Sequence, residues 1–156
     1  MLAEQLHVIP GLKAADQTAA VDSESINMGL LHEVLALVQL GNVSVADDTL
    51  KVYSGASAGT KTTAIRFRYR KSGAAAKSAS ADVWGAWTLA VAADGLTISN
   101  ASDDDFLYQI EVLSDMMTAD EPWLTMELAG TSTACLASIV FVCRGRFQAN
   151  AVPTAI

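Results

Sequence analysis

Residues 63–71, TAIRFRYRK, alternate between apolar and basic side chains. The apolar side chains fall on one side of an extended chain and the arginines on the other (Ile65, Phe67, Tyr69; Arg66, Arg68, Arg70). Successive side chains of a β-strand point to opposite faces of its sheet, so this pattern predicts one half-buried strand with a basic outer face.

This strand lies in the basic segment of an acidic chain. Residues 49–81 contain seven Lys or Arg and no Asp or Glu, whereas the whole chain carries a net charge of −7. Such a stripe would attract an acidic partner surface or the acidic part of a second copy. Nucleic acid is disfavoured, because the net charge repels phosphates and Phe67 and Tyr69 lie opposite the arginines. An ordinary solvated strand face is the simpler alternative.

The length of 156 residues fits one domain, and 51% of the residues are hydrophobic. No apolar run approaches the roughly 18 residues of a membrane helix. The apolar content predicts many buried strands and a surface that partner subunits cover, although abundant alanine would also raise the hydrophobic percentage.

The first residues lack the basic start of a secretory signal. Cys135 and Cys143 would lie about 26 Å apart along one strand, so we expect free thiols, as in a reducing cytosol.

Turn signals divide the chain into eight or nine expected strands. They cover residues 21–28, 30–40, 49–54, 63–71, 83–91, 96–99, 106–113, 123–128 and 135–144, the last being central. Residues 30–40 also fit a helix, but the Gly41-Asn42 stop favours a strand, and Asp94-Gly95 predicts a hairpin. Residues 114–122 form an acidic connection with one helical turn. The spacing predicts an all-β fold, an antiparallel β-sandwich or jelly roll.

Both ends of the chain are expected to be extended arms. Residues 1–20 mix polar residues, alanine and Pro-Gly, so we predict an N-terminal arm with at most a short strand at residues 6–9. Residues 21–147 would form the sandwich domain, and residues 148–156 a C-terminal tail that ends apolar.

No catalytic or cofactor site is evident. Residues 55–62, GASAGTKT, nearly match a P-loop, but Thr60 stands where glycine must precede the lysine, and a strand follows. His7 and His32 have no recognisable nucleophile beside them. Residues 103–105, DDD, lack the spacing of a calcium loop, and no zinc pattern is present. We therefore expect no enzyme, no cofactor and no metal.

Tryptophans suggest one alternative. Trp84, Trp87 and Trp123 would suit a sugar-stacking platform of a carbohydrate-binding sandwich. Trp84 and Trp87 are three residues apart, however, so they fall on opposite strand faces unless Gly85 forms a bulge. At least one of the two is therefore expected in the core.

The order of several segments resembles a known group of proteins. The segments are LHVIP (6–10), SESINM (23–28), the apolar residues 33–40, YQIEV (108–112), the strand 123–128 and the apolar residues 139–142. Together they resemble small virion proteins encoded in the head region of tailed bacteriophages, over most of the chain outside residues 74–93. The resemblance implies a capsid decoration or cement protein without catalytic residues. It would be a homo-oligomer, often a trimer, made in the bacterial cytoplasm and bound to the major capsid protein outside the head.

Three elements are the expected contacts with a partner. They are the N-terminal arm, the basic strand face and the C-terminal tail (Leu6, Val8, Ile9, Leu12; Arg66, Arg68, Arg70; Val152, Ile156). Arms that reach neighbouring subunits would tie copies together and raise the effective affinity. A tail or connector component, or a carbohydrate-binding sandwich for host attachment, is the alternative function.

Overall fold

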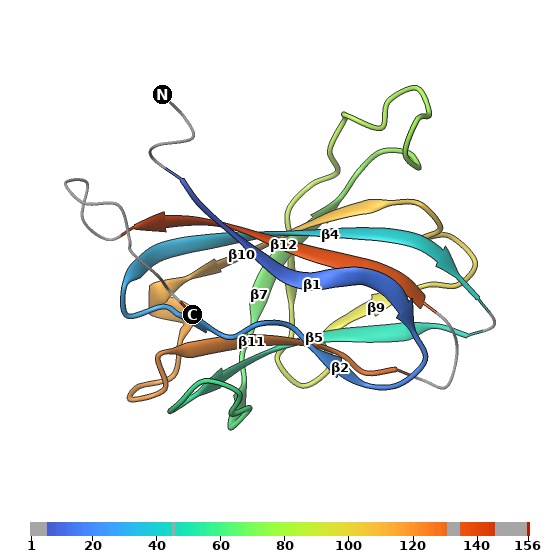
Figure 1. The fold of residues 1–156 in the computed structure, drawn as a ribbon. Coiled ribbons are helices and arrows are strands. Elements are labelled where there is room, and N and C mark those ends of the chain that lie inside the picture. The colour runs from blue at the N-terminus through green and yellow to red at the C-terminus, as the bar shows by residue number, and fades with distance from the viewer. Residues whose placement is uncertain (1–5, 45, 131–134, 146–155) are drawn as a thin grey trace.

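A computed structural model describes residues 6–44, 46–130, 135–145 and 156. Two antiparallel sheets pack face to face, which makes the protein an all-β sandwich as predicted (Figure 1). Sheet A has the strand order β1 (His7–Gln17), β12 (Cys135–Gly145), β4 (Leu31–Val43), β10 (Leu107–Leu113), β7 (Phe67–Lys71), β8 (Thr88–Ala90). Sheet B has the order β2 (Val21–Asp22), β11 (Trp123–Leu128), β5 (Asp48–Gly55), β6 (Thr63–Ala64), with β3 (Ile26–Asn27) paired to β11 and β9 (Leu96–Ile98) paired to β5.

Residues 63–71 belong to both sheets. β6 pairs with β5 in sheet B, and β7 pairs with β10 and β8 in sheet A. Between them, Ile65 is buried and Arg66 is exposed, and Phe67 is fully buried again. The predicted alternation is therefore confirmed, but the single strand is wrong, because the chain crosses from one layer to the other at this point (Figure 1). Such a crossing strand forms a corner of a sandwich.

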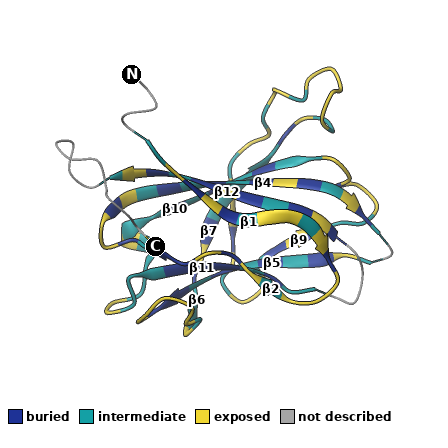
Figure 2. Ribbon diagram, viewed as in Figure 1, coloured by how far each residue is buried: buried dark blue, intermediate teal, exposed yellow. Residues whose placement is uncertain are grey.

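The core lies between the two sheets. β4 and β12 each bury every second side chain on the inner face (Val34, Ala36, Val38, Leu40; Cys135, Ala137, Ile139, Phe141, Cys143), and the alternation is visible along both strands in Figure 2. β4 is thus a strand as expected, but the expected stop at Gly41-Asn42 is wrong, because the strand continues through both residues to Val43. Both cysteines face the core as free thiols.

Several strands pair differently from the prediction. The expected arm is wrong for residues 7–17, since β1 is an edge strand paired with β12. The expected hairpin around Asp94-Gly95 is also wrong, because β8 joins sheet A while β9 joins sheet B. The expected strand 21–28 is broken into β2 and β3, where Ser23 and Ser25 contact β11. β12 lies second from the edge rather than at the centre of its sheet.

Other connections agree with the prediction. β10 and β11 lie where the apolar patterns placed them, and a single 3-10 turn (Ser114–Met116) forms in the acidic connection between them. Within the described ranges, no helix has the length and apolar character needed to cross a bilayer.

A glycine allows the edge strand β1 to pack tightly against the core. Gly11 is buried at a register irregularity of the β1–β12 pairing, and a Cβ atom at this position would overlap the ring of Phe141. We expect Gly11→Ala to lower the free energy of unfolding by about 1–3 kcal/mol, measured by urea denaturation. Gly85→Ala is the matched control: its Cβ would meet only the Lys71 carbonyl oxygen at 3.4 Å. Equal stability of the two variants would contradict this packing.

The core thiols should couple stability to alkaline pH. Burial raises the pKa of Cys143 from 9.0 to about 12, so the folded state retains a proton that the unfolded chain releases. The free energy of unfolding therefore falls as pH rises above 9, by up to ~1.4 kcal/mol per pH unit for this thiol. Cys143→Ala should show a shallower decline between pH 9 and 11 in urea titrations. An equal decline of the free energy of unfolding with pH in the wild type and in Cys143→Ala would contradict a raised pKa for the Cys143 thiol.

Candidate interaction face

The outer face of sheet A presents aligned rows of side chains. The strand register places one row across all six strands: Val8, Val142, Leu35, Glu111, Arg68, Leu89. The neighbouring row crosses five strands: Pro10, Val140, Leu37, Gln109, Arg70. Both rows change from apolar to polar between β4 and β10, and the first row becomes apolar again at the exposed Leu89 on β8. The two sides of the face therefore differ chemically.

The half over β1, β12 and β4 is apolar. This apolar half consists of Val8, Pro10, Leu35, Leu37, Val140 and Val142. The Val8 side chain is 59% exposed and Val140 is 36% exposed, whereas the two leucines and Val142 are intermediate. Exposed apolar side chains that stand singly are ordinary, but a set aligned over three neighbouring strands is typical of an interaction surface.

The half over β10, β7 and the segment before β8 contains stacked arginines and tryptophans. The guanidinium carbon of Arg70 lies 5.0 Å from the ring centroid of Trp84 and 4.6 Å from that of Trp87, and the same carbon of Arg68 lies 5.2 Å from Trp87. We call these four residues the Arg–Trp ladder. Stacking of this kind orders long side chains and contributes about 0.5–1 kcal/mol for each exposed pair.

The position of the tryptophans corrects the expectation that at least one of them lies in the core. Trp84 and Trp87 are both half-buried on the outer face. Trp84 forms only an isolated bridge with Ser72, and Gly85 donates its N–H to the Lys71 carbonyl, so residues 84–87 are not a regular strand. Strand alternation therefore does not apply to this pair. Trp123 is on β11 in sheet B, so the three tryptophans form no common platform.

The two ladder arginines differ in their partners on β10. Nη1 of Arg68 lies 3.1 Å from Oε2 of Glu111, an ion pair without hydrogen-bond geometry at that oxygen. Nε of Arg70 donates a 2.7 Å hydrogen bond to Oε1 of Gln109, which is neutral. Among the described residues, Arg70 has no carboxylate partner.

The expected contact residues are distributed over several places. Val8, Arg68 and Arg70 share the outer face of sheet A, and Arg66 is exposed at the crossing between β6 and β7. Ile9 is a core residue only 3% exposed, so its side chain is not available to a partner.

The remaining expected contacts are Leu6, Leu12, Val152 and Ile156. Leu12 packs against the core, and Leu6 lies just before β1. Ile156 is exposed, whereas Val152 and the rest of the C-terminal tail lie outside the described residues.

Sequence reasoning missed the apolar half apart from Val8, although a signal was present. Residues 34–38, VLALV, are apolar at every position, and a strand of this kind needs cover on both faces. The inner side chains of β4 meet sheet B, whereas Leu35 and Leu37 point outward and remain partly exposed. The continuous run therefore indicated a second covered face.

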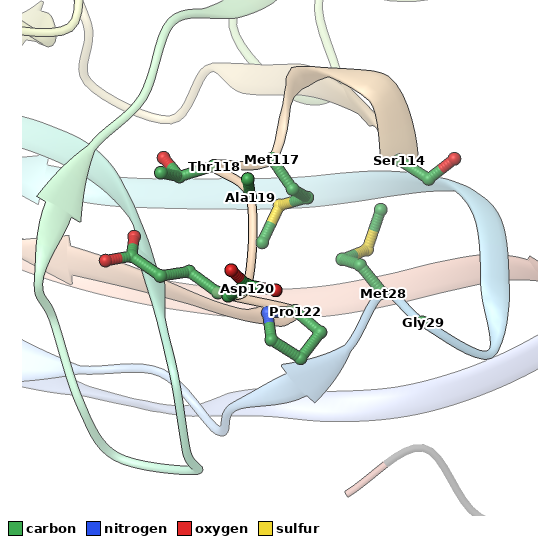
Figure 3. A pocket seen from close by; sticks show the side chains of 9 residues that line it. Met28, Gly29, Ser114, Met117, Thr118, Ala119, Asp120 and Pro122 are labelled. Carbon is green, nitrogen blue, oxygen red and sulfur yellow. The ribbon is translucent and has the colours of Figure 1, made fainter.

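An open hollow of about 420 Å³ lies between the β3–β4 turn and residues 114–122. The side chains of Met28 and Met117 line it from opposite sides (Figure 3). The carboxylate of Glu121 accepts hydrogen bonds from Ser54 at 2.5 Å and Thr63 at 3.2 Å, so it holds this connection against sheet B. In the described part of the chain, no group of three or more His, Cys, Asp or Glu side chains is placed to hold a metal ion.

Comparison with known proteins gives no relative: no family model, no curated protein and no solved structure matches this chain.

The ladder should be detectable as an energetic coupling. In a double-mutant cycle of Arg70→Met and Trp87→Leu, we expect a coupling of about 0.5–1 kcal/mol in the free energy of unfolding, measured with urea. The matched cycle of Arg66→Met and Trp87→Leu should give a coupling near zero, since no ring contact is found for Arg66 among the described residues. Equal couplings in the two cycles would contradict the ladder.

Proposed function

We propose that the protein is a structural virion component, a decoration protein that binds the outside of a tailed-bacteriophage head through the outer face of sheet A. The observation that carries this proposal is the pairing of an aligned apolar half with the Arg–Trp ladder on one face. Apolar side chains and rigid tryptophans and arginines are the groups that dominate protein–protein interfaces.

Charge favours a protein partner with an acidic surface. The ladder arginines lie on this face, whereas the whole chain carries a net charge of −7. An acidic partner would therefore be attracted to the ladder and repelled by the acidic remainder of the molecule, which orients the protein as it docks. In the proposed function this partner is the major capsid protein, and the resemblance of the order of sequence segments, such as LHVIP (6–10) and YQIEV (108–112), to small phage head proteins supports that identity.

Carbohydrate binding is less well supported by the same geometry. A sugar platform needs free indole faces, but Trp84 and Trp87 stack on guanidinium groups and Trp123 lies on the other sheet. A tail or connector component would use the same kind of face. It differs from a decoration protein in copy number, since decoration follows the whole shell lattice and a connector occupies one vertex.

Co-sedimentation with phage heads stripped of the protein tests the proposal. Wild-type protein should bind saturably, at a copy number on the scale of the shell lattice. Val140→Asp should weaken binding at least about tenfold, because it places a charge at the centre of the apolar half. Thr97→Asp is the matched control: it puts the same charge on an exposed position of β9 in sheet B.

Three outcomes would contradict parts of the proposal. Absence of wild-type binding to heads would overturn the decoration function. Copy number at the level of one vertex would favour a connector role. Equal loss of binding in Val140→Asp and Thr97→Asp, with both variants folded by circular dichroism, would remove the outer face of sheet A as the contact.

A further inference from the structure

Arg70 is the most constrained cation on the proposed docking face. Trp84 and Trp87 pack against its guanidinium group, and Gln109 fixes the Nε atom. The two terminal nitrogens of the group have no hydrogen bond or ion pair among the described residues. A free arginine loses rotamer freedom when it binds, but this side chain is already held, so binding at its open edge requires little further ordering.

Neighbouring cations are compensated within the molecule. On β7, Arg68 faces Glu111 and Lys71 binds Asp103. On β12, Arg144 lies 3.4 Å from Glu33. Arg70 faces Gln109 instead, although the register gives it the same kind of position opposite β10 that Arg68 has. Within the described part of the chain, one full positive charge therefore remains uncompensated beside the apolar half.

The free edge of a fixed guanidinium group matches a planar carboxylate, with two parallel N–H···O hydrogen bonds. Nucleic acid is a poorer match, because the chain as a whole is strongly acidic and would repel a polyanion. A single acidic side chain within an otherwise apolar protein segment fits both the isolated positive charge and the adjacent apolar half.

We propose that Arg70 binds a single carboxylate side chain in an otherwise apolar segment of the partner protein, and that Trp84 and Trp87 hold the Arg70 guanidinium group in position. This inference rests on the proposed function for the identity of the partner, but it assigns the site and the chemistry of the group that it recognises. The apolar residues beside that carboxylate would lie over Leu37 and Val140, which share the row of Arg70.

A peptide titration tests the site without phage heads. The probe is an acetylated and amidated peptide with one glutamate between apolar residues, and the readouts are tryptophan emission and the NMR signal of the Arg70 Nε–H. Arg70→Lys keeps the charge but loses the fork and the stacking, so we expect binding about tenfold weaker. Arg66→Lys is the matched control and should bind within about twofold of wild type, because Arg66 is exposed at the crossing between β6 and β7, outside the Arg–Trp ladder.

A second variant distinguishes loss of the binding site from a loss of folding in Arg70→Lys. Gln109→Glu places a carboxylate beside Arg70, as Glu111 is placed beside Arg68, so it should block the peptide while the protein stays folded. Peptide with glutamine in place of glutamate should not bind to the wild type. Unchanged affinity in Gln109→Glu, or in the glutamine peptide, would overturn the inference, as would tighter binding of a single-stranded oligonucleotide.

The two proposals fail in different ways. Peptide binding that depends on Arg70, together with no binding to heads, would retain the carboxylate site and reject the decoration function. Head binding that is unchanged in both Arg70→Lys and Gln109→Glu would retain the decoration function and reject Arg70 as its anchor.

Discussion

The passage of the chain from sheet B to sheet A is the constraint on which the rest of the structure depends. Ile65 and Phe67 are both buried, so this short segment is fixed to the core on each side of the crossing. Phe67 lies 6.3 Å from Tyr69 between ring centroids, and Tyr69 lies 6.3 Å from Tyr108 on the neighbouring β10. These inward contacts fix the strand, and the same alternation then turns Arg68 and Arg70 outward.

The inner side of β7 ends in a partly buried polar contact between Lys71 and a buried aspartate. Lys71 binds Asp103, whose carboxylate also accepts the backbone N–H of Ser99. Burial and the Asp103 charge raise the pKa of Tyr108 well above its ordinary value, so its hydroxyl stays protonated. Because a buried polar group needs a partner, this cluster holds the loop of residues 99–106 onto the end of β7.

Alternation in the sequence predicted the faces of strands better than their partners. Residues 63–71 and 34–40 show which side chains are buried, because burial depends on local period. Pairing is a long-range property, so nothing in residues 88–98 indicates that β8 and β9 join opposite sheets. The tryptophan positions were missed for a related reason: residues 84–87 are irregular, and no period governs their direction. Where the chain is regular, sequence alone gives the inside and outside of this sandwich.

The pairing of β7 with β10 also bears on how such a surface changes during evolution. Gln109 and Glu111 differ in one terminal group, an amide in place of a carboxylate, and both face arginines across the same register. Exchanging the two would move the uncompensated charge from Arg70 to Arg68, roughly 7 Å along the strand, without altering the core. In the function proposed above, such an exchange would shift the contact point on this face through surface substitutions alone, so the site could follow changes in a partner's surface while the fold stays constant.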